Sequence, residues 1–297
     1  MKEAKVYFTR TITPASIMQV YEAVGFSLPG KVAVKLSTGE PGGHNFLDPQ
    51  LIGDLVRKLD GTIVECNTAY VGKRYTTIDH LEAARAHGFT EIAHVDIMDQ
   101  DGDMSLPVTE GKHLRENYVG KNLAHYDSIL MLSHFKGHAM GGFGGALKNM
   151  SIGIASARGK AWIHSAGTID DRTILWENIA QQNDFLEAMA EACQSVMNYR
   201  KDKIVYLNVM NRLSVDCDCD KNPAAPCMKD IGVLASLDPV ALDQACLDLV
   251  YQSNDPGRDQ LIERIETRNG RHTVDYAAML GIGSKDYQLI DLDQKKS

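Results

Sequence analysis

Short apolar runs rich in β-branched residues recur along the chain and alternate with longer stretches that have helical spacing. Runs of this kind are typical of strands that are buried on both faces of a sheet. We therefore predict strands at residues 5–8, 31–36, 62–66, 91–97, 128–135, 203–210 and 230–237, and a last one at 287–292.

Helix start signals stand between these runs. A capping residue directly before a proline marks a start at Thr13-Pro14 and another at Asp238-Pro239. A third helix is predicted from Thr77, and Gly88 is placed to end it as a C′ glycine. Apolar residues at helical spacing predict a fourth helix from about residue 176 to residue 200.

Strands that alternate with helices predict an α/β fold, with a mostly parallel or mixed sheet and helices on both faces. We expect one domain over residues 1–297, and a weaker alternative places a boundary in the polar, turn-like segment near 165–175. Ligands of such sheets bind beyond the carboxyl ends of the strands. The loops after Phe135 and Met210 are therefore the first places to look for a site.

The composition excludes several classes of protein. A net charge of −8 and the lack of a long basic run argue against a nucleic-acid surface. The first ten residues contain no signal-peptide core, and no window approaches a membrane span, so we expect a cytoplasmic protein with no membrane partner. In that compartment the six cysteines are expected to be thiols or metal ligands rather than a disulfide framework.

The loop after the strand at 128–135 has unusual chemistry. HFKGHAMGGFGGALKN, at 134–149, contains two histidines, two lysines and five glycines before a predicted helix start at Ala146. Glycine backbone and free helix N–H groups bind anions, and lysines and histidines add positive charge. The candidate site residues here are His134, Lys136, His138, Gly141, Gly142, Gly144, Gly145, Lys148 and Asn149.

The spacing of these glycines matches neither common phosphate-binding fingerprint. No GxxxxGK[ST] register fits, and Leu147 stands where GxGxxG needs its third glycine. The alternative is a strained strand-to-helix turn that only packs against its neighbours. We expect a positive φ at Gly144, which a β-branched residue would resist.

A second unusual segment, VDCDCDKNPAAPC, begins at Val215. Thiolates bind zinc or iron, and carboxylates complete such shells. The candidate metal ligands are Asp216, Cys217, Asp218, Cys219 and Cys227. A Cys217–Cys219 disulfide and free thiols are the alternatives, while Cys193 and Cys246 lie on helical stripes and are predicted core residues.

Two further segments are weaker candidates. Residues 99–110 resemble a calcium loop, but Met104 stands where the sharp turn needs glycine, so an acidic loop at a strand end is the preferred interpretation. His164 lies in a predicted short strand at 159–164, where a lone histidine is usually a structural hydrogen-bond partner.

The stretch SHFKGHAMGGFGGALKNMSIGIASARGKAWIHSAG, at 133–167, resembles the signature of the uncharacterised Fe–S centre proteins, also called domain of unknown function family 362. The strand before VDCDCD and the block DIGVLASLDPVALDQACLDLV, at 230–250, resemble the same family. The likeness covers most of residues 90–250 and implies functional roles for His134, His138 and Lys148, with Lys160 and His164 also matching the signature.

This chain departs from the family at one place. Many members carry a ferredoxin-like cysteine insert after the His-Ser pair, whereas the 29 residues that follow Ser165 here contain one cysteine. A [4Fe–4S] cluster needs about four thiolates at set spacing. The resemblance supports a metal ion, zinc or iron, at Cys217 and Cys219, but a [4Fe–4S] cluster would need an outside ligand.

These observations lead to one main hypothesis. The two loops meet at one end of the sheet, where Cys217 and Cys219 hold a metal, helped by Asp216 or Asp218. His134 and His138 are further ligands or an acid–base pair, and the lysines and glycine amides bind a small anion. The protein is then a metal-dependent oxidoreductase or a proton-transfer enzyme.

Two alternatives stay open. In the first, the metal site is structural and the protein is a non-catalytic relay or binding module. In the second, no metal is bound, and the glycine loop holds a phosphate-bearing cofactor. The substrate, the identity of the metal and the oligomeric state, a homo-oligomer included, are not determined by the sequence.

Overall fold

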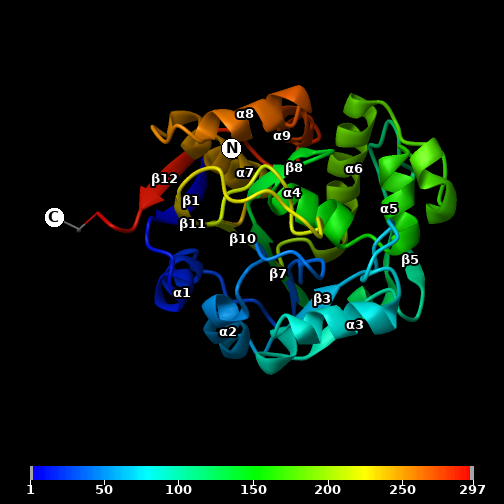
Figure 1. Cartoon of the computed structure of the whole chain (residues 1–297), viewed down its shortest axis with the longest axis horizontal. Coiled ribbons are helices and arrows are strands. Elements are labelled where there is room, and N and C mark those ends of the chain that lie inside the picture. Colours follow the sequence, from blue (N-terminus) through cyan, green and yellow to red (C-terminus); the bar gives the residue numbers. More distant parts are fainter. Residues whose placement is uncertain (1–2, 295–297) are drawn as a thin grey trace.

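The computed structural model describes residues 3–294, and its centre is one mixed sheet of eight strands (Figure 1). The strand order is β12-β1-β11-β10-β7-β2-β3-β4. The strands are β1 (Ala4–Thr9), β2 (Val32–Lys35), β3 (Thr62–Glu65), β4 (Val95–Ile97), β7 (Ser128–His134), β10 (Ile204–Met210), β11 (Gly232–Ser236) and β12 (Tyr287–Asp291).

All neighbouring strands are parallel except at β11, which is antiparallel to both β1 and β10. The α/β class with a mostly parallel, mixed sheet is therefore confirmed. Each of the eight strands predicted from the apolar runs is present, although β4 occupies only the last three residues of the predicted run 91–97. A 3₁₀ turn, Phe89–Glu91, leads towards it and ends within the predicted run.

The helices cover both faces of the sheet (Figure 1). The elements α1 (Pro14–Ala23), α2 (Pro49–Lys58) and α3 (Thr77–Ala86) lie on one face. The other face carries α4 (Ala146–Lys148), α6 (Gln182–Arg200), α7 (Pro239–Gln252), α8 (Arg258–Thr267) and α9 (Arg271–Met279), with α5 (Ala157–His164) beside α6.

Side-chain alternation along β7 explains why both faces are covered. Ile129 and Met131 contribute to one apolar cluster, whereas Leu130 and Leu132 contribute to the other. Every residue of β7 is buried. A strand with apolar residues on both faces is stable only when helices cover each of them, because burial of apolar surface contributes about 25 cal/mol per Å².

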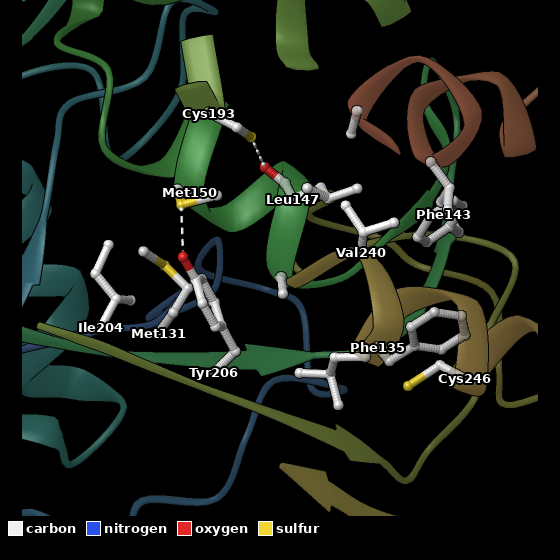
Figure 2. Close-up of a cluster of buried hydrophobic side chains, with 14 of the residues drawn as sticks. Met131, Phe135, Phe143, Leu147, Met150, Cys193, Ile204, Tyr206, Val240 and Cys246 are labelled. Atoms are coloured by element: carbon white, nitrogen blue, oxygen red, sulfur yellow. Dashed lines mark hydrogen bonds between the residues drawn. The ribbon is translucent and has the colours of Figure 1, made fainter. Parts of the chain in front are cut away.

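The cluster under α4, α6 and α7 contains polar atoms that find partners inside it (Figure 2). The hydroxyl of Tyr206 lies 3.4 Å from the sulfur of Met150, and the thiol of Cys193 donates to the carbonyl oxygen of Leu147 at 3.1 Å. Cys246 is buried in the same cluster. The two predictions of core cysteines are confirmed.

The local start signals mostly act as expected. Thr13 and Asp238 cap α1 and α7 through their side chains, and Gly88 follows α3 with a φ of +84°. The helix predicted from 176 starts later, at Gln182, after a 3₁₀ turn over Arg172–Glu177.

The strand predicted at 159–164 is wrong. These residues belong to α5, whose first amides are capped by Ser156, so hydrogen bonding of the N-terminus decided the conformation. The acidic segment after β4 also differs from a calcium loop, because its residues 103–107 form β5 (Asp103–Pro107). That strand pairs with β6 (Glu116–Gly120) in a hairpin.

Strands from before and after the segment 165–175 lie in the same sheet. The division of the chain into one domain or two stays a prediction. No helix within residues 3–294 combines the length and the apolar character needed to cross a membrane.

Candidate functional site

A cavity of about 1090 Å³ opens where β2, β3 and β7 end. These strands are parallel neighbours, so their carboxyl ends meet at one edge of the sheet. The glycine-containing loop after β7 and the cysteine loop after β10 both line this cavity. His134 and His138 therefore face the same site as Cys217 and Cys219.

His134, at the end of β7, is tied to the loop that follows β10. Its Nδ1 lies 3.2 Å from Asp218 Oδ2, and its Nε2 lies 2.6 Å from the carbonyl oxygen of Asn211. Lys136 contacts the other carboxylate oxygen of Asp218. Both ring nitrogens thus face oxygen atoms of the loop after β10, and His134 connects the end of β7 to that loop.

The pair of Lys136 and Asp218 is fully buried. Burial acts to raise the pKa of Asp218, but the charges of Lys136 and His134 overcome it and lower that pKa to about 2. Burial lowers the pKa of Lys136, and Asp218 opposes that change. Asp218 is thus an ion-pair partner in this structure, and its oxygens are not directed at a metal.

His138, in the β8 (Lys136–His138) and β9 (Gly142–Gly144) hairpin, has a fixed tautomer. Its Nδ1 accepts hydrogen bonds from the backbone N–H groups of Met140 at 3.2 Å and Gly141 at 2.9 Å. The proton of the neutral ring is therefore on Nε2, which lies 3.9 Å from Cys219 Sγ. Burial, followed by the charge of Lys148, lowers the pKa of His138.

Cys217 and Cys219 form a disulfide beside His138. The three residues make a group whose ligand atoms lie within 4.8 Å of one another. Cys227 is not part of it, because its thiol donates to the carbonyl oxygen of Leu213 outside the cavity lining. Asp216 accepts from Ala224 N–H and pairs with Arg264, so the predicted metal ligands separate into different environments.

The cysteines of residues 3–294 do not converge on a four-thiolate site. Cys193 and Cys246 are core residues, and Cys66 donates to the carbonyl oxygen of Ile154 on the cavity wall. The residues present therefore do not fit a [4Fe–4S] cluster.

Two cavity lysines stand apart from the buried ion pairs. No residue of the described chain forms a hydrogen bond or ion pair with Lys148 Nζ, and Lys160 Nζ donates only to the carbonyl oxygens of Ala155 and Cys66. Burial, followed by the charge of Lys35, lowers the pKa of Lys148 to about 8. Burial likewise lowers the pKa of Lys160.

His164, at the end of α5, also lines the cavity. Its Nδ1 lies 2.6 Å from the carbonyl oxygen of Lys160, so Nδ1 carries the proton and Nε2 keeps its lone pair. The ring stacks on Phe185, with the centroids 4.8 Å apart. Burial lowers the pKa of His164 to about 4, and this ring is therefore neutral at pH 7.

Several amides of the glycine loop have partners inside the protein. Gly144 and Gly142 pair with Lys136 and His138 across the hairpin, and Gly141 N–H donates to the His138 ring. The first amides of α4, on Ala146 and Leu147, donate to the two carboxylate oxygens of Asp243 in α7. The amides of Gly141, Ala146 and Leu147 are therefore engaged within the protein, and anion binding by the remaining glycine amides stays a prediction.

Asp243, which sequence reasoning missed, decides the shape of this turn. It is buried, and it also accepts from Asn208 Nδ2 at 2.7 Å. A Cβ at Gly145 would lie 2.4 Å from Asp243 Oδ1, so only glycine leaves room for the carboxylate. Burial raises the pKa of Asp243 to about 6, opposed by its backbone donors.

Asn149 likewise has a structural set of partners. Its side-chain amide donates to the carbonyl oxygens of Lys35 and Leu132 and to Ser133 Oγ. It therefore joins the ends of β2 and β7 beneath the cavity, although it was predicted as a ligand-binding residue.

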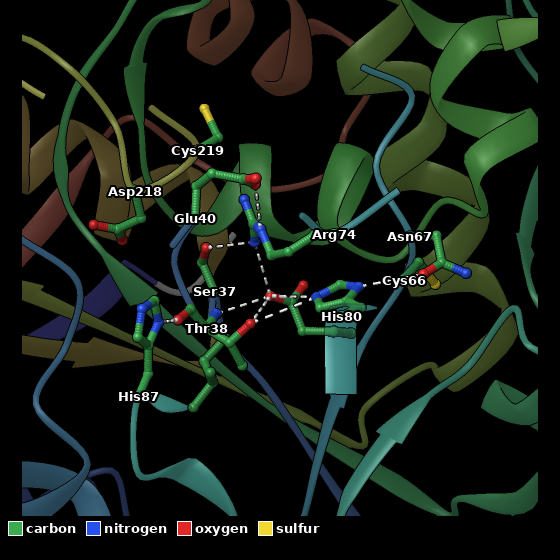
Figure 3. Close-up of polar contacts among 12 residues, drawn as sticks. Ser37, Thr38, Glu40, Cys66, Asn67, Arg74, His80, His87, Asp218 and Cys219 are labelled. Atoms are coloured by element: carbon green, nitrogen blue, oxygen red, sulfur yellow. Dashed lines mark hydrogen bonds and ion pairs between the residues drawn. The ribbon is translucent and has the colours of Figure 1, made fainter. Parts of the chain in front are cut away.

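A buried charge network on the β3 side of the cavity was not predicted at all (Figure 3). Lys35 Nζ lies 3.0 Å from Glu65 Oε2, and Arg74 pairs with Glu40 at 3.1 Å and with Glu65 at 3.3 Å. His80 lies next to this network, and burial lowers its pKa. The signal in the sequence is a charged residue at the end of an apolar strand run, as at Lys35 and Glu65.

Comparisons with known proteins identify a family. A family model described as domain of unknown function (DUF362) matches residues 32–248. No curated protein matches the chain.

Two solved structures are among those that resemble it. Lactate racemase apoprotein from Thermoanaerobacterium thermosaccharolyticum matches at 16% identity and a TM-score of 0.38, over 68% of this chain and 50% of that one. A protein from Thermotoga maritima matches at 13% identity and a TM-score of 0.38, over 90% of this chain and 58% of that one. The match thus spans half of the first structure and little more than half of the second.

Adjacent glycines give a matched test of the turn. Gly145→Ala is expected to destabilise the protein by about 1–3 kcal/mol, because the new methyl group overlaps the Asp243 carboxylate. The positive φ predicted at Gly144 is wrong, because the left-handed residue of this loop is Gly142. Gly144→Ala is therefore expected to change stability by less than about 1 kcal/mol, since its Cβ would meet only Lys148 Cδ at 3.5 Å. Urea unfolding measures both, and equal losses would contradict this assignment.

Proposed function

The chain belongs to the DUF362 family, and from this premise we propose that its cavity binds a small carboxylate- or phosphate-bearing ligand and exchanges a proton with it through Lys148. The observation that carries the proposal is the imbalance of buried charge around the cavity. Lys35, Arg74 and Lys136 are matched by carboxylates, whereas Lys148 and Lys160 have no carboxylate partner among residues 3–294.

A buried cation without a counter-charge is unfavourable, and an anionic ligand removes that penalty. Lys148 and Lys160 line the same cavity, and each lowers the pKa of His164 through its positive charge. An anion between these two amines would accept charge-assisted hydrogen bonds from both. The rest of the cavity fixes their position, because α4 is tied down through Asp243 and α5 is capped by Ser156.

Proton exchange follows from the protonation state of Lys148. An amine with a pKa of about 8 is present in both forms near neutral pH, which suits a general acid or base. His164 provides a neutral Nε2 lone pair on the same cavity and can accept a hydrogen bond from the ligand. His134 and His138 are positioning residues in this proposal, since their ring nitrogens are engaged by protein groups.

Removal of the Lys148 ammonium should weaken anion binding. For Lys148→Met we expect an affinity for malonate or inorganic phosphate that is lower by about 10- to 100-fold, as for the loss of one hydrogen bond to a charged group. Isothermal titration calorimetry at pH 7 measures the affinity. The matched control, Lys203→Met at an exposed position, should bind like the wild type, and unaltered binding by Lys148→Met would overturn the proposal.

The same affinity should depend on pH with a defined sign. Because the pKa of Lys148 is lowered to about 8 in the free protein, the ammonium is lost as the pH rises through 8. The affinity for malonate, whose charge is constant from pH 7 upward, should weaken above pH 8 by up to about tenfold per pH unit. Lys148→Arg, which stays charged, should remove this dependence, and a wild-type affinity that rises with pH would contradict the assigned role.

The second candidate function is metal binding at the cysteine loop, which the grouping of His138, Cys217 and Cys219 favours. A disulfide carries no thiolate, so this function requires the reduced cysteines. His138 Nε2 then donates to sulfur, while Cys217 and Cys219 are the metal ligands. A zinc or iron ion held there would supply a Lewis acid that polarises a ligand oxygen.

Anaerobic reduction followed by cobalt titration tests this second function. Reduced wild-type protein should show the near-ultraviolet charge-transfer band of a cobalt–thiolate bond, and Cys219→Ser should lose most of it. Cys227→Ser is the matched control, because that thiol lies outside the cavity lining. Elemental analysis of the anaerobically purified protein gives the native metal, and the absence of both metal and band would exclude the function.

A further inference from the structure

A second group of potential metal ligands lies around helix α6. None of these residues lines the cavity. We name it the α6 cluster: Asp184 and Glu187 on α6, His113 in the loop between β5 and β6, and His272 on α9. The helices α6 and α9 pack against each other (Figure 1), so the cluster joins three elements that are distant in sequence.

The donor atoms of His113, Asp184 and Glu187 lie within 4.8 Å of one another, and His272 contacts this group through the second carboxylate oxygen of Glu187. His113 Nε2 lies 2.7 Å from Glu187 Oε2 and 3.7 Å from Asp184 Oδ1. His272 Nε2 lies 2.9 Å from Glu187 Oε1. In a tetrahedral zinc site with bonds near 2.0–2.1 Å, ligand atoms are about 3.3 Å apart, and the distances from His113 Nε2 to Glu187 and to Asp184 bracket that value.

The loop that carries His113 is held in place independently of the cluster. Glu191, one turn after Glu187, accepts the backbone N–H groups of Lys112, His113 and Leu114 at 2.7–3.0 Å. It also accepts from the Tyr276 hydroxyl at 3.0 Å, which fixes α9 near His272. A site whose ligands are already positioned loses little entropy when the ion binds.

We propose that the α6 cluster is a zinc-binding site, with His113, His272, Glu187 and Asp184 as ligands. Two imidazoles and two carboxylates suit zinc better than magnesium or calcium, which prefer oxygen ligands alone. The ligand set neutralises a divalent ion. Since zinc would link the β5–β6 loop and α9 to α6, its role at this site is structural.

Lys112 supplies a competing interaction. Its Nζ lies 2.9 Å from Glu187 Oε2, the oxygen that faces His113, and its side chain is 62% exposed. Zinc binding must displace this ammonium. If the cluster binds zinc, loss of the Lys112 ammonium should raise the affinity for zinc, because a competing cation is removed from Glu187.

Zinc titration of the full chain tests the proposal. All variants carry Cys217→Ser and Cys219→Ser, which removes the cavity sulfurs as ligands. The chelator-treated background protein should bind one zinc ion and unfold at a higher temperature with zinc. His113→Gln and His272→Gln should each weaken binding by roughly 100-fold or more, and Lys112→Gln should strengthen it. His125→Gln, an exposed histidine outside the cluster, is the matched control.

X-ray absorption of the zinc-loaded background protein should show nitrogen and oxygen ligands only. The proposal is overturned if this protein binds no zinc, or if neither histidine variant changes the affinity. Each outcome is independent of anion binding in the cavity, because Lys148 is intact in every variant.

Discussion

Burial of charge at the carboxyl ends of β2, β3 and β7 is the constraint on which the rest of this structure depends. Three parallel strands end side by side, and each ends in a buried charged or polar residue, namely Lys35, Glu65 and His134. A buried charge is tolerated only when it is paired and hydrogen-bonded. Glu65 accordingly forms ion pairs with both Lys35 and Arg74. Asp218, in the loop after β10, contacts both Lys136 and His134. These ion pairs connect separate loops and so maintain the shape of the cavity. Lys148 differs from the paired cations because no carboxylate of residues 3–294 forms an ion pair with it.

The glycine-containing loop acts through its shape more than through its own amides. Many of its N–H groups are engaged in the β8–β9 hairpin, by His138 and by Asp243, and the charged groups that face the cavity are side chains. Small residues here allow close approach, as at Gly145, where the carboxylate of α7 occupies the space of a Cβ. A glycine-rich sequence before a helix therefore need not indicate a phosphate cradle. The deciding question is whether the helix N-terminus already has an internal acceptor.

Histidines in this protein have different roles because their second ring nitrogen has different partners. His138 accepts two backbone N–H groups through Nδ1 and so presents a proton on Nε2. His164 donates through Nδ1 and so presents a lone pair. His113 and His272 both direct Nε2 at the carboxylate of Glu187. Burial acts to raise the pKa of Glu187, but hydrogen bonds from Lys112 and the two histidines lower it to about 2. Residue type alone would have treated these four side chains alike.

The sequence by itself determined the sheet, most helix starts and the family, because these depend on local periodicity, capping residues and a long motif. It also located the cavity, since parallel strands bring the loops after β7 and β10 to one edge. Only the tertiary structure decided which residues of those loops are paired. Asp216, Asp218 and Cys227 look alike as metal ligands in sequence, yet Arg264, Lys136 and the Leu213 carbonyl engage them in turn. Partners such as Glu65, Arg74 and Asp243 come from distant segments, and pairing between distant segments leaves no periodic signal in a single sequence.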